Sequence, residues 1–168
     1  HGILGNLPVR TIALSDHVGR FVQEHGRVQA RRMRRVYYGI DPTPWEAAGD
    51  DRIEGADRRE VLAEFGFPDD AIIFTCVARF APQKAHEVLL QALHQARQDP
   101  AVGSRIRLLL VGDDPFGDGR QRAEAEANRL GLGDACVFAG IRRDVPRLLA
   151  ASDVFAMASR WEGLGLVF

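Results

Sequence analysis

The sequence predicts an α/β protein in which a parallel β-sheet is covered by helices on both faces. The first observation behind this prediction is that short apolar runs alternate along the chain with amphipathic segments, which is typical of βα units. The second is that the run 71–77 is apolar at nearly every position, as a strand buried on both faces must be. The chain has 168 residues, of which 46% are hydrophobic, so it can bury the core that such a sheet needs.

The individual elements follow the same alternation from one end of the chain to the other. Strands are expected at 11–14, 33–38, 71–77, 106–111, 135–139 and 154–157. Helices are expected from Ser15 to Gly26, at 57–65, at 84–98, at 120–130 and after Asp144, with a loop rich in turn-forming residues over 41–56.

Caps and apolar stripes identify three of these helices most clearly. Ser15 is predicted to cap the first helix and Asp144 to cap the last. The predicted buried face of the first helix is Val18, Phe21 and Val22. The predicted buried face of the helix at 84–98 is Ala85, Val88, Leu89, Ala92, Leu93 and Ala96.

Charge and composition exclude several function classes. The formal net charge is −1, which gives no global field to attract nucleic acid. No apolar run approaches the ~20 residues of a membrane span. Cys76 and Cys136 each lie in an apolar run without metal-type spacing, so both are expected to be reduced core residues, and a cytoplasmic setting follows.

Residues just after each strand are the first candidates for a site, because open parallel sheets bind ligands outside the carboxyl ends of their strands. Arg79 and Lys84, which flank a helix start, could neutralise the two phosphates of a nucleotide diphosphate, the first as a planar fork and the second as a point charge. The alternative interpretation is a pair of solvated surface cations.

A second candidate follows the last predicted strand, where the sequence reads Ser-Arg-Trp-Glu-Gly-Leu-Gly-Leu-Val-Phe over 159–168. A glycine turn that opens a helix would leave backbone N–H groups to hold phosphate. Glu162 would add an acceptor for hydroxyl groups. Trp161 could form a wall of a sugar pocket, although an aromatic residue at a strand end more often serves packing.

Other polar residues have plainer interpretations. Asp113, Asp114 and Asp118 could bind a metal ion, but turn formation explains them equally well. The histidines are interpreted first as surface or cap residues, with the alternative that His86, which is close to Lys84 in the sequence, lines the same site. The basic run is interpreted as a solvated segment, with an acidic lipid surface or nucleic acid as a minority alternative; it comprises Arg27, Arg31, Arg32, Arg34 and Arg35.

Five motifs, in this order, resemble the donor half of retaining GT-B glycosyltransferases, the large group called family 4 or glycosyl transferases group 1. They are Arg79 to Lys84, Leu108 to Asp113, Val137 to Gly140 with Asp144-Val145, Ala151 to Val154, and Ser159 to Leu166. The resemblance implies a Rossmann-like C-terminal donor domain of the GT-B fold. It assigns residues 1–33 to the tail of an N-terminal acceptor domain with its interdomain connection, and residues 34–168 to a nucleotide-sugar donor-binding domain that is incomplete at its C-terminus.

The resemblance also implies roles for individual residues. Arg79 and Lys84 match the cationic pair that grips the donor diphosphate, and Glu162 matches the first glutamate of a paired motif that contacts the transferred sugar. The turn whose amides lie over the phosphates corresponds to Gly163, Leu164, Gly165 and Leu166, and the region that meets the base corresponds to Gly140, Ile141 and Arg142. Three positions depart from the family pattern: Ala85 replaces a usual Gly, Ala158 a Pro and Tyr38 an Asn.

The function implied is metal-independent transfer of a hexose, with retention, from a UDP- or GDP-linked donor. No cofactor is expected, and the acceptor would be lipid-linked, a glycan or a small molecule. The resemblance is compatible with peripheral association of the full-length protein with the inner face of the membrane. A sugar-nucleotide epimerase of GT-B fold and a non-catalytic sugar-nucleotide-binding module remain as alternatives, and the 168 residues alone are expected to be inactive.

Overall fold

The computed structural model describes residues 10–45, 55–115, 117–163, 165 and 167. The chain divides into two compact units, one made of His1–Asp41 with Glu162–Phe168 and the other of Pro42–Trp161. Each unit is described by itself. The domain boundary expected between residues 33 and 34 stays a prediction.

The larger unit contains a four-stranded sheet in which every pairing is parallel. Its spatial order is β5 (Cys136–Gly140), β4 (Ile106–Val111), β3 (Ile72–Val77) and β6 (Val154–Phe155). The expected strand at 106–111 is confirmed at both ends, whereas β6 stops two residues earlier than expected.

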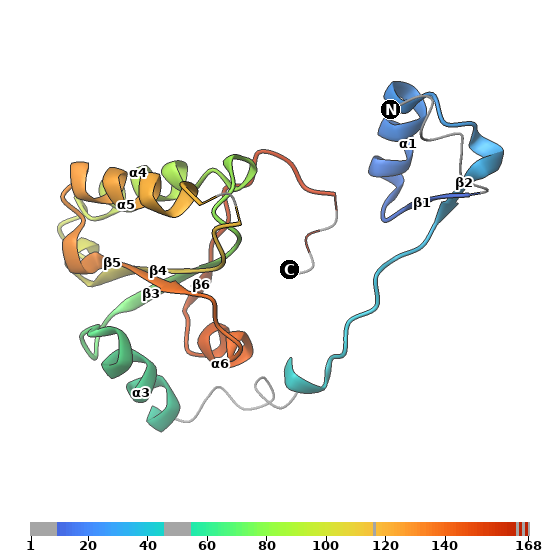
Figure 1. Ribbon diagram of the computed structural model, residues 1–168. Helices are drawn as coiled ribbons and strands as arrows, with labels where there is room; N and C mark the ends of the chain where they lie inside the picture. The colour runs from blue at the N-terminus through green and yellow to red at the C-terminus, as the bar shows by residue number, and fades with distance from the viewer. Residues whose placement is uncertain (1–9, 46–54, 116, 164, 166, 168) are drawn as a thin grey trace. The chain divides into compact units, whose positions relative to one another are not determined.

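Helices cover both faces of this sheet (Figure 1), which confirms the predicted fold class. The helices α4 (His86–Ala96) and α5 (Gly119–Arg129) lie over one face, and α3 (Gly55–Phe65) and α6 (Val145–Ala150) lie over the other. A hydrophobic core lies on each face of the sheet, and alternate residues of β4 belong to different cores. Leu108 and Leu110 pack toward α4 and α5, and Leu109 packs toward α3 and α6. Burying each leucine contributes about 1.5–3 kcal/mol.

Both cysteines lie in this sheet core, as predicted. Burial raises the pKa of each thiol, Cys76 and Cys136, to about 12, so both are protonated near neutral pH.

The buried face predicted for the helix at 84–98 is confirmed for Ala85, Leu89 and Leu93 and is wrong for Val88, Ala92 and Ala96, which are exposed. A 3-10 turn, Pro82–Lys84, comes first, and α4 begins only after Ala85, whose φ of 49° is left-handed. The face that α4 buries is His86, Leu90 and Leu93, and Val88 is 46% exposed. The left-handed residue separates the turn from the helix, so one continuous stripe from Ala85 onward does not form.

The smaller unit pairs β1 (Thr11–Ala13) with β2 (Met33–Arg35) in parallel, with α1 (Asp16–Gly26) between them in sequence and a 3-10 turn at Ala30–Arg32. Ser15 caps α1 as predicted, because its Oγ accepts a hydrogen bond of 3.2 Å from the amide of Val18. The second strand ends at Arg35 instead of continuing to residue 38.

The predicted buried face of α1 is corrected at one position. Phe21 is 54% exposed and stacks on the ring of His25, whereas the buried residues of the helix are Gly19 and Gly26. A Cβ on Gly19 would lie 3.6 Å from the Cβ of Ala13, so the helix presents its smallest residue to β1.

Candidate functional site

Backbone hydrogen bonds continue to connect the chain segments that follow the carboxyl ends of β3, β4 and β5. The amide of Phe80 donates to the carbonyl of Asp113 at 2.7 Å, and the amide of Gly112 donates to the carbonyl of Gly140 at 2.8 Å. Glycine at 112 permits this approach, because a Cβ there would overlap the carbonyl oxygen of Ala78. Three of the predicted site segments therefore meet at one edge of the sheet.

Arg79 and Lys84 belong to one compact turn at that edge. Arg79 is exposed directly after β3, and Lys84 is the last residue of the 3-10 turn. The amide of Ala81 donates to the carbonyl of Arg79 at 2.8 Å, and the amide of Lys84 donates to the carbonyl of Ala81 at 2.9 Å. Ala85 follows in the left-handed conformation, a backbone geometry that glycine adopts more readily than alanine.

A clamp fastens this turn to the segment that precedes Glu162. The amide of Arg160 donates to the carbonyl of Gln83 at 2.8 Å, and the side-chain amide of Gln83 donates to the carbonyl of Trp161 at 2.7 Å. Arg160 also pairs with Glu87 of α4 at 2.9 Å. The residue before Lys84 is thereby bound to the residue before Glu162, although 78 positions separate Gln83 from Trp161 in the sequence.

The expected base-contacting segment begins at the last residue of β5. Gly140 has a left-handed φ of 70°, and Ile141 is 71% exposed. The guanidinium of Arg142 donates to both carboxylate oxygens of Asp144 at 2.8 Å and to Glu64 of α3 at 2.5 Å. Because the side chain of Arg142 already has these partners, a ligand at this segment would meet mainly its backbone.

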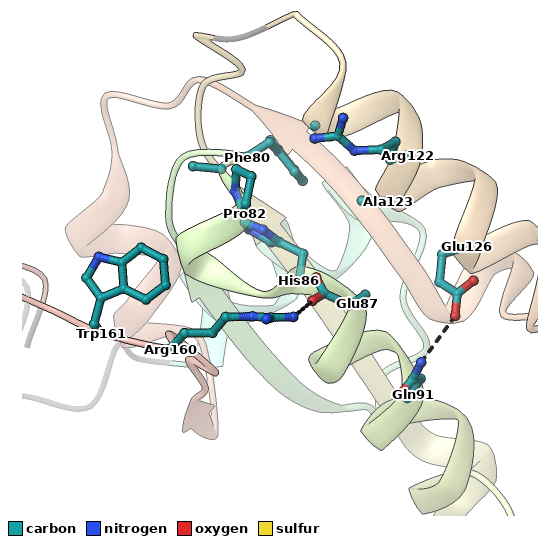
Figure 2. A pocket seen from close by; sticks show the side chains of 12 residues that line it. Phe80, Pro82, His86, Glu87, Gln91, Arg122, Ala123, Glu126, Arg160 and Trp161 are labelled. Carbon is teal, nitrogen blue, oxygen red and sulfur yellow. Dashed lines mark hydrogen bonds and ion pairs between the residues drawn. The ribbon is translucent and has the colours of Figure 1, made fainter.

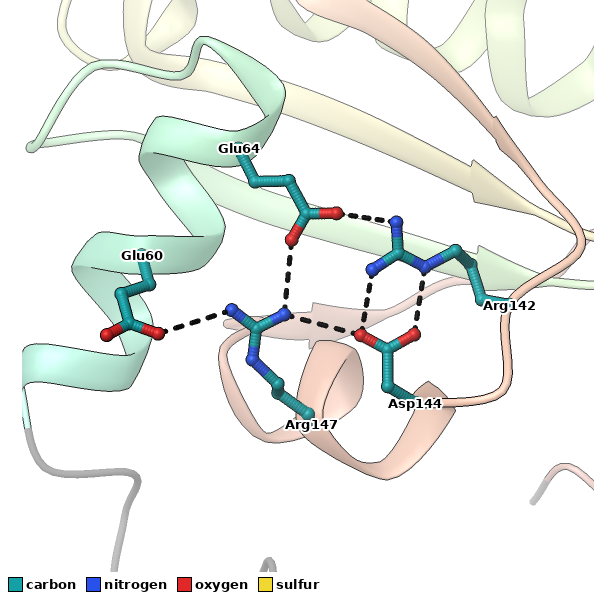
Figure 3. Close-up of polar contacts among 5 residues, drawn as sticks. All are labelled: Glu60, Glu64, Arg142, Asp144 and Arg147. Atoms are coloured by element: carbon teal, nitrogen blue, oxygen red, sulfur yellow. Dashed lines mark hydrogen bonds and ion pairs between the residues drawn. The ribbon is translucent and has the colours of Figure 1, made fainter.

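Asp144 occupies the N-cap position of α6 as predicted, but its side chain makes no capping hydrogen bond. Its carboxylate instead accepts from Arg142 and from Arg147, which also reaches Glu64 and Glu60 (Figure 3). The hydrogen bonds from Arg142 lower the pKa of Asp144 and, with those from Arg147, the pKa of Glu64. This ion-pair network joins α3 to the loop that carries Arg142.

Each carboxylate of the aspartate cluster is engaged by the protein. Asp114 accepts hydrogen bonds from the amides of Gly117, Gly119 and Arg120 at the start of α5. Asp113 accepts from the amide of Asp114, and Asp118 pairs with Arg122. The described residues contain no group of three His, Cys, Asp or Glu side chains that could hold a metal ion.

Glu162, Gly163 and Gly165 belong to the smaller unit. Glu162 is half-buried, and the hydroxyl of Ser15 donates to the carbonyl of Gly163 at 3.0 Å. Leu164 and Leu166 lie outside the described residues, and of the described ones Gly165 and Val167 are in no helix.

Sequence reasoning missed the roles of Gln83 and His86. His86 is only 5% exposed and stacks on Phe80 with 4.5 Å between ring centroids. Burial lowers its pKa, so the imidazole is neutral near pH 7. The spacing of His86 to Leu90 and Leu93, which is i, i+4 and i+7 on one helix face, was the available signal.

Comparison with known families finds a match to "Glycosyl transferases group 1" over residues 57–168. The chain is 30% identical, over 92% of its length, to a putative glycosyltransferase, EpsF of Bacillus subtilis, of which it covers 37%. It is 36% identical, over 78% of its length, to a D-inositol 3-phosphate glycosyltransferase of Rhodococcus opacus, of which it covers 31%. The chain thus spans about a third of the length of these relatives.

Solved structures share the fold. Anabaena Alr3699/HepE in complex with UDP-glucose matches with a TM-score of 0.79 and 26% identity, covering 98% of this chain and 42% of that protein. WaaG, a glycosyltransferase involved in lipopolysaccharide biosynthesis, matches with a TM-score of 0.75 at 22% identity, covering 93% of this chain and 40% of that protein. The described part of the chain contains no helix that is both long and apolar enough to span a membrane.

Proposed function

This chain belongs to the glycosyl transferases group 1 family, and from this premise we propose that it forms the donor-binding part of a glycosyltransferase. The enzyme would move a hexose from a nucleotide-diphosphate sugar to an acceptor, with retention of anomeric configuration, as in family 4. The observation that carries this proposal is the clamp of Gln83, Arg160 and Trp161, which ties the Lys84 turn to the peptide leading into Glu162.

The donor is proposed to be a UDP- or GDP-linked sugar. The complexes of HepE with UDP and with UDP-glucose support a nucleoside diphosphate as the ligand class. Backbone groups of Gly140, Ile141 and Arg142 are proposed to meet the base, because the side chain of Arg142 is held by Asp144 and Glu64.

Charge compensation is the proposed source of catalysis. As the bond between the anomeric carbon and the diphosphate breaks, negative charge grows on the leaving phosphate. Arg79 and Lys84 would stabilise that charge, the first by a planar pair of donors and the second as a point charge. Lys84 is the single lysine of the chain, since the remaining 21 of its 22 Lys and Arg residues are arginines, so a compact ammonium group is used at this position alone.

The remaining roles concern the transferred sugar and its surroundings. Glu162 would accept hydrogen bonds from the sugar hydroxyls, and the backbone of Gly163, Leu164, Gly165 and Leu166 would donate to the phosphates. With two cations available, no metal ion or other cofactor is required for the proposed reaction. The proposed setting is the cytoplasm, with peripheral association at the inner face of the membrane and without nucleic acid as a partner.

The test is turnover by the full-length protein with UDP-glucose and with GDP-mannose as donors. Release of the nucleoside diphosphate and NMR analysis of the new anomeric centre would report transfer and its stereochemistry. Arg79→Ala and Lys84→Ala are expected to abolish most of the turnover, while Arg105→Ala, at an exposed pair with Asp70, serves as the control. Donor epimerisation without acceptor would favour the epimerase, and tight donor binding without any turnover would favour a binding module.

A further inference from the structure

A pocket of about 690 Å³ lies between the N-terminal parts of α4 and α5, within the larger unit. Its volume falls in the ~300–1,000 Å³ range of small-molecule sites. Arg79, Lys84 and the segment Gly140–Arg142 are not among the described residues that line it. The pocket is lined instead by their neighbours in the sequence, Phe80, Ala81 and Pro82 of the same turn, and by Trp161.

The floor of the pocket is apolar and aromatic. Phe80 is fully buried there, with Pro82 and Ala123 beside it. Trp161 stands at one side (Figure 2), and its side chain is 62% exposed although its carbonyl is held by Gln83 at 2.7 Å. An exposed indole on a fixed backbone offers a flat apolar face against which a ring can stack at small cost in conformational entropy.

Charged groups surround this floor, but they already neutralise one another. Two carboxylates, Glu87 and Glu126, and two guanidinium groups, Arg122 and Arg160, line the pocket. Arg160 pairs with Glu87, Arg122 with Asp118, and Glu126 with Arg129. With every charge partnered, neither an anion nor a cation gains from entering, so the pocket favours a neutral ligand.

Hydrogen-bonding groups of both kinds nevertheless face the pocket. Gln91, whose amide lies 3.5 Å from Glu126, supplies a donor and an acceptor. His86 is 95% buried against Phe80, and its ring makes no hydrogen bond within the described part of the chain. A ligand hydroxyl in the pocket would give this ring a hydrogen-bond partner.

We propose that this pocket is a second binding site, one for a neutral oligosaccharide, separate from the donor site. A sugar ring has an apolar face for Trp161 and hydroxyl groups that both donate to carboxylates and accept from guanidinium, amide and imidazole groups. A site of this kind would hold a glycan chain on the protein whether or not the chain is the acceptor.

The test is calorimetric titration of the full-length protein with maltopentaose, cellopentaose and chitopentaose, with and without saturating UDP. We expect at least one of them to bind with a dissociation constant of about 1 mM or tighter. Trp161→Ala should weaken this binding at least about tenfold and Gln91→Ala by a smaller factor, because stacking on the indole supplies most of the contact area. Trp45→Ala, at the other tryptophan of the chain and outside the pocket lining, should leave it unchanged.

Three results would overturn the proposal: no binding of any of the three oligosaccharides, unchanged binding by a folded Trp161→Ala variant, or displacement of the oligosaccharide by UDP. The last result would place the glycan in the donor site. The two proposals fail separately, because absence of sugar transfer by the same protein preparation, with or without UDP binding, would contradict the transferase function, whereas oligosaccharide binding is measured without turnover.

Discussion

The side-chain amide of Gln83 donates a hydrogen bond of 2.7 Å to the carbonyl of Trp161, and so joins the turn that ends at Lys84 to the peptide that enters Glu162. The backbone bond from Arg160 to Gln83 runs beside it at 2.8 Å. The relative placement of two short segments therefore depends on one glutamine, and this relationship can be tested without altering any charged group.

Gln83→Ala should lower kcat/KM of the full-length enzyme by roughly tenfold, because small displacements of catalytic groups are costly. The free energy of unfolding should fall by only about 1 kcal/mol, since one hydrogen bond is lost and the backbone bond to Arg160 remains. Steady-state kinetics and chemical denaturation measure the two effects. Gln98→Ala is the matched control, because the side-chain amide of Gln98 donates to the carbonyl of His94, four positions earlier in the sequence. Equal kcat/KM values for the two variants would contradict a positioning role for Gln83.

Lys84→Ala should reduce the rate of transfer far more than it destabilises the protein. Losing a charge-assisted contact to a leaving phosphate should cost roughly 2–4 kcal/mol of transition-state stabilisation. Lys84→Arg should restore the rate only in part, since a planar fork does not replace a compact ammonium group. A folded Lys84→Ala variant with an unchanged rate would identify Lys84 as an ordinary surface lysine.

How far the sequence predicts the structure differs from element to element. The strand Ile106–Val111 was predicted at both ends because it is buried along its whole length and is apolar at every position except Arg107. The buried face of α4 was predicted only in part, with Leu93 but without His86 and Leu90, because the left-handed turn at Ala85 is made by a residue that rarely adopts it. A glycine at that position would have marked the break.

The site segments were predicted from their places after strands, but the contacts that position them were not. Arg142 is held by Glu64, which lies 78 positions earlier, and no local pattern links the two residues. Asp144 was assigned as a cap on local grounds, yet two arginines compete successfully for its carboxylate because charge-assisted bonds are stronger than a bond to a neutral amide.

Metal chelation should leave activity intact. If Arg79 and Lys84 compensate the diphosphate, a divalent ion has no essential role, and Asp113→Asn should be far milder than Lys84→Ala. Asp114 is already engaged by three backbone amides, which is the chemistry of a turn. The measurement is donor use by the full-length enzyme in excess EDTA. Complete loss of activity that Mg²⁺ or Mn²⁺ restores would show that the reaction depends on a metal ion.

The ion-pair network of Glu64, Arg142, Asp144 and Arg147 should make stability depend on pH. Hydrogen bonds from Arg142 lower the pKa of both Asp144 and Glu64 in the folded protein. A carboxyl group whose pKa is lowered on folding contributes stability above its unfolded pKa of about 4, and this contribution is lost as the pH falls further. Asp144→Asn should therefore lower the free energy of unfolding by about 1 kcal/mol at pH 7, a value reduced for the partial exposure of the pair.

The difference in free energy of unfolding between Asp144→Asn and the unaltered protein should shrink as the pH falls below about 4. Urea denaturation across this range measures it, with the exposed Asp134→Asn as the control. A difference that stays constant from neutral to acidic pH would mean that Asp144 stabilises the fold by packing and not by its charge.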